Sequence, residues 1–358
     1  MTEALQASVL DRMKRKKFVP ILIILIALLG SACTNTQQEP QNQDTTLPPS
    51  NVEPIEPTAP APPAYTSPLT GMGGDEPFTQ RLFMVMVENA PAARPQSGLN
   101  KADLVYEVLA EGGITRFAAF YQSEYPENVG PVRSIRPYFL DLGGGFDAIL
   151  VHAGGSEEAK SIITKKGLPS INGLNGGMEP DYFWRVPFRK KPHNLYTDFT
   201  KLKAAAEALK LRKESEIPEF YFHDPDDPVI GEDAAKITIT YNPSYTVEYQ
   251  YDPVKKAYLR SMDGKPHKDL ITDEQIAPTN ILVIKAKHRV LDREGRLAVD
   301  LRSGGSGTLF ERGKGIPVKW VNVKGVIRAS VNGEEVKFYP GKTWIEIIPE
   351  EGASLSYE

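Results

Sequence analysis

Short apolar runs bounded by turn residues recur after residue 68 and predict buried β-strands. In the first folded region these runs are 82–87, 104–110, 114–121 and 147–152. The two middle runs meet at Gly112-Gly113, and a two-residue glycine loop is a strong hairpin signal. Helices are predicted to start at Ser156 and to cover 199–213, with Thr197 as the N-cap of the second.

The last third of the chain is richer in strand signals. Polar and apolar residues alternate over 237–241 and 247–251, and further strands are predicted over 281–284, 321–331 and 343–348. Because strands and helices mix without a regular alternation, the predicted fold class is α+β. We expect an α+β domain over 68–215, a linker over 216–233 and a β-rich domain over 234–358.

The N-terminus carries the pattern of a secretory signal. A basic cluster at 12–17 precedes an apolar run over 18–29, and Gly30-Ser31-Ala32-Cys33 follows. This run is interrupted by Pro20 and falls short of the about 20 apolar residues that a transmembrane helix needs. A cysteine after small residues resembles the lipobox of bacterial lipoproteins, although Gly30 stands where leucine is usual. We therefore predict a signal peptide over 1–33 and an acyl chain such as palmitate on Cys33.

Two alternatives for the N-terminus stay open. The apolar run could remain as an uncleaved anchor, and the chain could start at Met1 or at Met13, because residues 1–11 lack signal character. The segment 34–67 is rich in proline and has neither lysine nor arginine, which predicts a disordered tether. A lipid on Cys33 would hold the body on the outer face of the cell membrane.

Composition narrows the chemistry of the mature chain. Residues 33–358 carry 37 basic and 44 acidic residues, a net charge of −7, which disfavours nucleic-acid partners. Cys33 is the only cysteine, so no disulfide, cysteine nucleophile or cysteine metal site can form within the chain. The five histidines have no zinc-type spacing. We predict neither a metal site nor a cofactor.

The hairpin carries the first cluster of polar residues that could act chemically. With a two-residue loop, Glu107, Glu111 and Arg116 are predicted to share one face of the sheet. They would form either the charged floor of a ligand cleft or a salt bridge on a solvated face. The two glutamates lie about 13 Å apart along the strand, too far for a glycosidase pair. Either glutamate paired with Glu88 or Asp141 remains an open possibility.

Two further candidate regions lie at the starts of helices. Arg133 and Arg136 could form a fork for a carboxylate or a phosphate group, or pair with acidic residues of the same fold. His152 and Ser156 lie where a strand end meets a helix start, which is a common position for ligands. The acidic residues at 157–158 already complement the helix dipole and disfavour a phosphate there.

A fourth region follows a basic stretch. His193 could act as a general acid or base or bind a ligand together with Asn194, or it could hydrogen-bond the loop backbone. Pro137, after the two arginines, suits the first turn of a short helix.

Several segments together resemble the YerB-like bacterial lipoproteins. They are Val87-Glu88-Asn89, 93–99, 110–116, 130–137, 151–156 and 192–196, and the likeness covers about 68–349. The resemblance implies a layered α+β sandwich, a β-rich second domain and a surface location of the Gram-positive type. It implies two consecutive domains of unknown function and no established activity, so no catalytic role is carried over.

Three functions remain, and we favour the first. It is a membrane-anchored module that binds a cell-wall polymer or an envelope protein, because the tether and the anionic body lack a catalytic signature. The second is a hydrolase or transferase acting on wall glycan or peptide, with Glu88, Glu107 or Glu111 as acid or base. The third, a solute-capturing lipoprotein, fits poorly because the chain lacks two repeated lobes.

Overall fold

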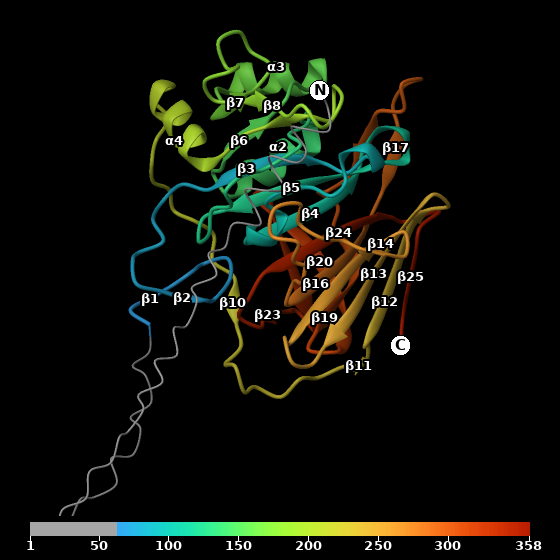
Figure 1. Ribbon diagram of the computed structural model, residues 1–358. Coiled ribbons are helices and arrows are strands. Elements are labelled where there is room, and N and C mark those ends of the chain that lie inside the picture. Colours follow the sequence, from blue (N-terminus) through green and yellow to red (C-terminus); the bar gives the residue numbers. More distant parts are fainter. Residues whose placement is uncertain (1–62) are drawn as a thin grey trace, which may run out of the picture. The chain divides into compact units, whose positions relative to one another are not determined.

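The computed structural model describes residues 63–358, which form one compact unit. The predicted signal peptide, Cys33 and the tether up to residue 62 lie outside these residues. Regular structure begins before residue 68, because Tyr65–Thr66 (β1) pairs with Gly73–Gly74 (β2). The predicted mixture of helices and strands is confirmed (Figure 1).

A sheet of twelve strands runs through both predicted domains. Its order is β22 (Glu334–Glu335), β21 (Val326–Val331), β20 (Lys314–Val323), β19 (Gly305–Glu311), β16 (Asn280–Ala286), β24 (Thr343–Pro349), β4 (Leu104–Leu109), β5 (Thr115–Tyr121), β3 (Phe83–Glu88), β6 (Ile149–His152) and β7 (Ser170–Asn172), with β11 (Glu232–Asp233) beside β20. The strands of the first and second halves meet where β24 pairs with β4 in parallel. One hydrogen-bonded ladder therefore joins segments that lie more than two hundred residues apart.

A second sheet of five strands comes from the C-terminal part of the chain. Its order is β15 (Lys265–Pro266), β14 (Ala257–Met262), β13 (Tyr245–Asp252), β12 (Lys236–Asn242) and β25 (Ser354–Tyr357). Alternating burial along β12 and β13 shows that one face of each is buried. That face packs on the large sheet in a cluster that contains Ile239, Val247, Ile281 and Ile348. Figure 1 shows this sheet beside β16 and β19.

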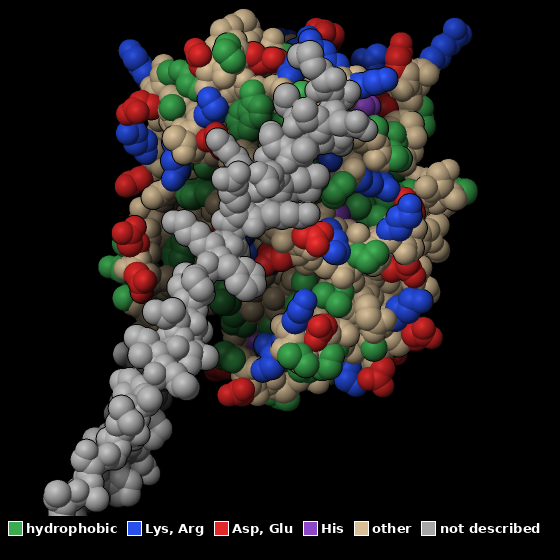
Figure 2. Space-filling view, in the orientation of Figure 1, with side chains coloured by type: hydrophobic (Ala, Val, Ile, Leu, Met, Phe, Trp, Pro, Cys, Tyr) green, Lys and Arg blue, Asp and Glu red, His purple; other side chains and the backbone are tan. Residues whose placement is uncertain are grey.

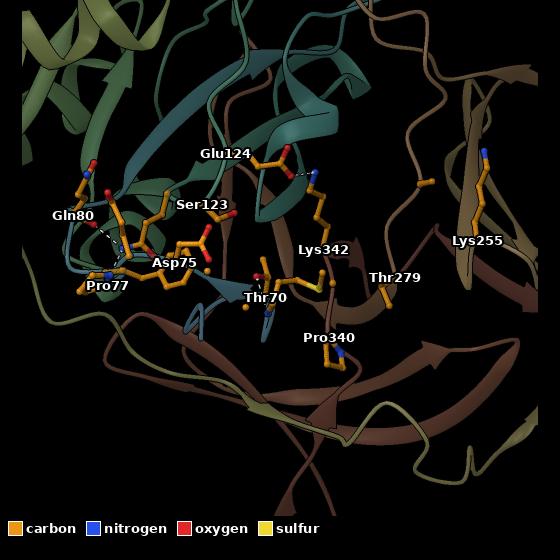
Figure 3. A pocket seen from close by; sticks show the side chains of 18 residues that line it. Thr70, Asp75, Pro77, Gln80, Ser123, Glu124, Lys255, Thr279, Pro340 and Lys342 are labelled. Atoms are coloured by element: carbon orange, nitrogen blue, oxygen red, sulfur yellow. Dashed lines mark hydrogen bonds and ion pairs between the residues drawn. The ribbon is translucent and has the colours of Figure 1, made fainter. Parts of the chain in front are cut away.

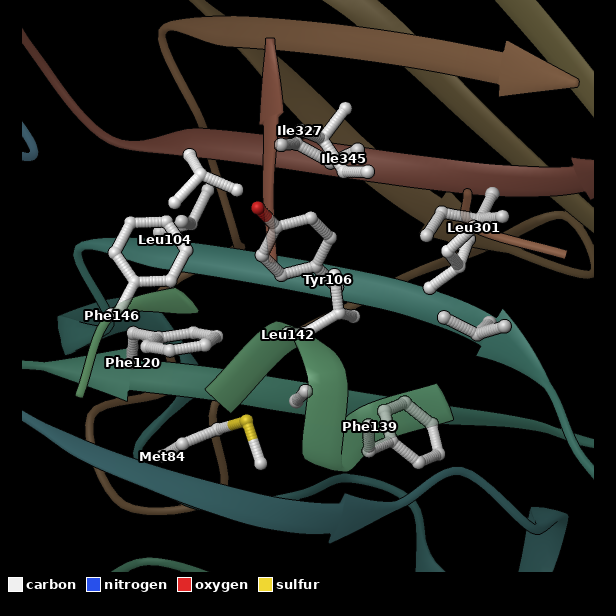
Figure 4. Packing of buried hydrophobic residues seen from close by; sticks show 14 of the residues in the cluster. Met84, Leu104, Tyr106, Phe120, Phe139, Leu142, Phe146, Leu301, Ile327 and Ile345 are labelled. Atoms are coloured by element: carbon white, nitrogen blue, oxygen red, sulfur yellow. The ribbon is translucent and has the colours of Figure 1, made fainter. Parts of the chain in front are cut away.

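Three helices cover the end of the large sheet formed by β3, β6 and β7. Helices α2 (Pro137–Gly145) and α3 (Glu157–Lys166) pack on one face, and α4 (Phe199–Ala208) packs on the other. Figure 4 shows Phe139 and Leu142 of α2 beside Met84, Tyr106 and the other side chains of the first core. Proline opens α2, as the sequence predicts.

Short elements complete the described fold. They are the two-stranded pairs β8 (Trp184–Arg185) with β9 (Leu195–Tyr196), β10 (Tyr221–Phe222) with β23 (Lys337–Phe338) and β17 (His288–Val290) with β18 (Leu297–Val299), and the 3-10 turns η1 (Pro91–Ala93), η2 (Leu99–Lys101) and η3 (Glu111–Gly113). Strand β10 and strand β11 of the large sheet lie in the segment 216–233 and pair with strands of the C-terminal half.

The glycine hairpin has a different register from the predicted one. Glu107 pairs with Phe117 across the ladder because the loop takes in a third residue, forming η3 (Glu111–Gly113). A shift of one residue turns a side chain to the other face of a strand. The prediction that Glu107 and Arg116 share a face is therefore wrong.

Two other boundaries differ from the sequence predictions. Residues 321–331 form the end of β20 and all of β21, because Lys324 and Gly325, with φ of 54° and 98°, make a tight turn. Helix α4 ends at Ala208, and its N-cap is Asp198, whose side chain accepts from the backbone N–H of Lys201.

Candidate functional site

The carboxyl end of β3 places Glu88 between two basic side chains. One carboxylate oxygen lies 3.1 Å from Nε of Arg133, and the other lies 2.9 Å from Nδ1 of His193. Glu88 is 4 % exposed, while both partners reach solvent. A buried carboxylate therefore orients an imidazole and a guanidinium at the surface.

The neighbouring strand β5 adds a second group of charges. Arg116 pairs with Glu88 across the β3–β5 ladder, so the two side chains leave the same face of the sheet. Its Nη1 donates to the carbonyl of Ser134 at 2.8 Å, and its Nη2 lies 3.5 Å from Glu111. Arg136 donates from Nε to the other oxygen of Glu111. We call Glu88, Glu111, Arg116, Arg133, Arg136 and His193 the arginine cluster.

Positive charge exceeds negative charge in the arginine cluster. Burial, together with the charges of Arg136 and Arg133, lowers the pKa of Arg116 to about 10. Burial works to raise the pKa of Glu111, but its hydrogen bond from Arg136 and the charge of Arg116 outweigh it, so that pKa is lowered. The arginine cluster thus holds three guanidinium groups and two carboxylates, and arginine N–H donors suit carboxylate and phosphate groups.

A pocket of 320 Å³ opens beside Glu111 and Arg136. Ser134, Ser156 and Glu157 form part of its wall, and Glu294 and Arg296 complete it. Its volume is at the lower end of the about 300–1,000 Å³ that small-molecule sites occupy. The arginine cluster thus has a recess in which a small group can reach it.

Two other predicted candidates lie apart from this recess. His152 is 1 % exposed, and its ring nitrogens contact the carbonyl of Gly154 and the hydroxyl of Ser170, each at 2.8 Å. Burial lowers the pKa of His152 to about 4. The amide of Asn194 bonds backbone carbonyls of its own loop. These two side chains hold local structure.

Ser156 both caps a helix and lines the pocket. It is the N-cap of α3, where its hydroxyl oxygen accepts from the N–H of Ala159 at 3.2 Å, and it also lines the pocket. Its hydroxyl proton is not used by the cap.

Glu107, the remaining candidate, belongs to a second cluster that is sealed between the two sheets. Glu107, Glu346 and Arg260 are each 0 % exposed. Arg260 donates from Nη2 to Glu107, and its Nε lies 4.0 Å from Glu346. Its guanidinium also lies 4.8 Å from the ring centre of Trp344. We call Glu107, Arg260, Glu346, Tyr241, Tyr245 and Tyr249 the buried cluster.

Tyrosine hydroxyls satisfy the carboxylates of the buried cluster. Tyr245 donates to Glu107 at 2.7 Å, and Tyr241 donates to Glu346 at 2.6 Å. Tyr249 also donates to Glu346 and accepts from Arg260 at 3.1 Å. Burial and the charge of Glu107 raise the pKa of Glu346. The cluster is a paired, desolvated set of groups with no route to solvent.

Sequence reasoning missed Arg260 and Glu346, although a signal was present. Arg260 shares the buried phase of β14 with Tyr258 and Met262. Glu346 interrupts the apolar run of β24. A charge on the apolar phase of a strand indicates a buried ion pair, because an unpaired charge there would be very costly.

Other surfaces give weaker signals. A larger hollow of 740 Å³ lies between the two halves. In it Glu124 pairs with Lys342 at 2.9 Å (Figure 3), and Glu124 also pairs with Lys101. Figure 2 shows acidic and basic side chains interspersed on the visible face, without a broad patch of one sign. Within residues 63–358, no helix is long and apolar enough to cross a bilayer, and no group of His, Cys, Asp or Glu is placed to hold a metal ion.

Comparison with known proteins identifies similar chains. Residues 69–212 match the N-terminal domain of DUF3048, described as a protein of unknown function, and 237–345 match its C-terminal domain. The chain is 42 % identical over 295 residues to "Putative lipoprotein YerB" of Bacillus subtilis (strain 168), covering 81 % of this chain and 88 % of that protein.

A solved structure is also similar. The crystal structure of YerB protein from Bacillus subtilis matches with a TM-score of 0.74 and 41 % identity, over 81 % of this chain and 99 % of that chain. These findings confirm the resemblance that the sequence motifs indicate.

Proposed function

Starting from the fact that this chain belongs to the DUF3048 family, we propose that it is a lipid-anchored binding module of the cell envelope. In this proposal Cys33 carries the lipid, the body lies on the outer face of the membrane, and the arginine cluster binds an anionic group of a wall polymer. The name of the Bacillus subtilis relative, "Putative lipoprotein YerB", and the lipobox-like sequence support the anchor.

The observation that carries the binding proposal is a group of three arginines beside an open recess. Arg116 and Arg136 share Glu111, Arg133 has Glu88, and the pocket of 320 Å³ lies beside Arg136. Arginine binds carboxylates and phosphates through paired N–H donors. The body carries a net negative charge, so this recognition would depend on the discrete site and not on the general field of the protein.

One observation favours an enzyme as the second candidate. Glu88 fixes Nδ1 of His193 at 2.9 Å, and an oriented histidine can serve as a general base. Glycan cleavage by two carboxylates is less supported. Glu107 is sealed, and Glu111 has a lowered pKa, whereas the acid catalyst of that chemistry needs a raised one.

Sedimentation with purified cell wall tests the proposal. The folded body, residues 63–358, is mixed with wall and centrifuged, and the pellet is compared for the wild type, Arg136→Gln and Arg302→Gln. Arg302 is the matched control, because it pairs with Asp141 while its side chain is 78 % exposed. We expect Arg136→Gln to weaken sedimentation at least about tenfold, equal to about 1.4 kcal/mol.

Two outcomes would contradict the binding module. Equal sedimentation of wild type and Arg136→Gln would remove the arginine cluster from wall binding. Release of soluble wall fragments by the wild type, abolished in His193→Gln, would favour the enzyme. The anchor has its own test: labelling with a palmitate analogue should mark the full chain and not Cys33→Ala.

A further inference from the structure

The pocket beside the arginine cluster is built by both halves of the chain. Ser134 and Arg136 come from the segment before α2, while Glu294 and Arg296 come from the turn between β17 and β18. A Cβ placed on Gly295, at this turn, would lie 3.7 Å from the backbone nitrogen of Gly112. The β17–β18 hairpin therefore sits against the η3 loop and closes one side of the recess.

The hairpin holds Arg296 in a defined place. Its Nε lies 2.8 Å from Asp292, and its Nη2 lies 3.2 Å from Glu294. On the other wall, Arg136 is fixed by Glu111 and by the carbonyl of Ile135 at 2.8 Å. Each arginine keeps N–H donors beyond those used by these partners, because a guanidinium has five.

Acidic side chains also line the recess. Glu294 and Glu157 both line it, and a carboxylate can accept more bonds than the single one that Arg296 or Lys160 gives it. A ligand that carries only an anionic group would pair with the arginines and leave Glu157 and Glu294 without a ligand partner. A ligand that carries only a cationic group would pair with the glutamates and leave the arginines without a ligand partner. A ligand that carries both charges complements a wall of mixed sign better than either alone.

We propose that this pocket binds a small zwitterion, a free amino acid or a dipeptide, through its carboxylate and its ammonium group. The carboxylate lies between Arg136 and Arg296, and the ammonium group donates to Glu294 and Glu157. Ser134 and Ser156 offer hydroxyl groups between the two ends. The volume of 320 Å³ suits a ligand of this size. This inference rests on the proposed function and names the ligand class of the same site.

Calorimetric titration of residues 63–358 with four matched probes tests it. Alanyl-alanine has both charges, N-acetylalanine lacks the ammonium group, alaninamide lacks the carboxylate, and inorganic phosphate is a plain anion. We expect alanyl-alanine to bind with a Kd of about 1 mM or tighter, at least about tenfold tighter than each other probe.

Variants of the hairpin connect the binding to the proposed residues. Arg296→Gln should weaken alanyl-alanine binding about tenfold or more. Arg289→Gln, an exposed position on the same hairpin that does not line the pocket, should leave the Kd unchanged. Glu294→Gln should reduce the difference in Kd between alanyl-alanine and N-acetylalanine.

Each contrary result overturns the inference in a distinct way. No heat with alanyl-alanine up to about 10 mM would mean that the pocket takes no such ligand. Equal binding of N-acetylalanine or phosphate would make it a plain anion site, and equal binding of alaninamide a cation site. If alanyl-alanine does not bind but wall sedimentation still depends on Arg136, only this inference is overturned and the proposed function stands. If alanyl-alanine does not bind and wall sedimentation does not depend on Arg136, the inference and the proposed function are both overturned.

Discussion

The buried cluster and the arginine cluster both contain arginine and glutamate, but the first is enclosed in the core and the second lies beside an open pocket. Arg260, Glu107 and Glu346 are fully enclosed, and tyrosine hydroxyls complete their hydrogen bonds. Arg136 and Glu111 have a similar ion pair, but they line a pocket. The contrast teaches that an arginine–glutamate pair indicates binding only where its remaining donors face a space that a ligand can enter.

The two clusters are adjacent along the chain at Glu88-Asn89. Glu88 belongs to the arginine cluster, while Asn89 donates to Glu107 at 3.3 Å and to Tyr245 at 2.8 Å in the buried cluster. Successive side chains at the end of β3 thus serve opposite faces of the sheet. Binding at one cluster and stability from the other can therefore be separated by substitution.

The largest expected effect is on stability and comes from Arg260→Met. Removing the guanidinium leaves the carboxylate of Glu107 buried without its charge partner, which costs about 3–5 kcal/mol. Urea unfolding followed by tryptophan fluorescence measures it, since Trp344 lies 4.8 Å from this guanidinium. The double variant Glu107→Leu with Arg260→Met should be more stable than the Arg260→Met single variant. A single variant that loses under about 1 kcal/mol would mean that the pair is not desolvated.

The pH dependence of stability should distinguish the two clusters next. The pKa of Glu346 is raised in the folded chain, so between its ordinary value and the raised one the folded state holds the extra proton. The free energy of unfolding then falls as pH rises from about 4.5 to 8. The pKa of Glu111 is lowered, so its contribution is lost as pH falls below about 4.5.

Glutamine variants check each side of this pH profile by urea unfolding at several pH values. Glu346→Gln should flatten the fall toward alkaline pH, and Glu111→Gln should flatten the fall toward acid. The exposed Glu350→Gln should change neither slope. Identical profiles for all three variants would mean that neither carboxyl titrates differently in the folded and unfolded chains.

A smaller effect on stability, with a clear effect on binding, is expected in the arginine cluster. Arg136→Gln removes one of two basic partners of a half-buried carboxylate, and Arg116 still faces Glu111. We expect a loss of about 1 kcal/mol in urea unfolding, beside the tenfold weaker sedimentation with wall. A loss as large as that of Arg260→Met would show that this cluster is structural too.

The smallest effect should come from Arg302→Gln. Its side chain is 78 % exposed and pairs with Asp141 at 2.9 Å. Exposed pairs contribute about 0–1 kcal/mol, so both the unfolding midpoint and wall sedimentation should match the wild type. A clear change in sedimentation would extend the binding surface beyond the arginine cluster.

Local elements were predictable from the sequence, because they depend on nearby residues. The strands at 82–87 and 104–110, the helix after Ser156 and the proline that opens α2 all follow from apolar runs and caps. The hairpin register could not be predicted, because the sequence Gly112-Gly113 does not determine whether Glu111 belongs to the loop. The layered sandwich that the family resemblance implies, and the boundaries of the two domains, stay predictions.

The sequence predicted which residues belong to the site but not how they are arranged in space. Glu88, Arg133 and His193 come together, as do Glu111, Arg116 and Arg136. Arg296 was missed because it lies far along the chain, in a hairpin with no local sign of a ligand. Long-range pairing also explains why the sequence did not reveal one sheet across both halves, since the β24–β4 ladder joins Thr343 to Leu104.

The β24–β4 ladder also sets the order in which the chain can be completed during synthesis. Because β4 ends at Leu109 and β24 begins at Thr343, the inner edge of β4 has no partner until more than two hundred further residues have left the ribosome. Folding that waits for distant contacts is slow. In the lipoprotein that we propose, this delay leaves the chain unfolded while it passes through a translocation channel.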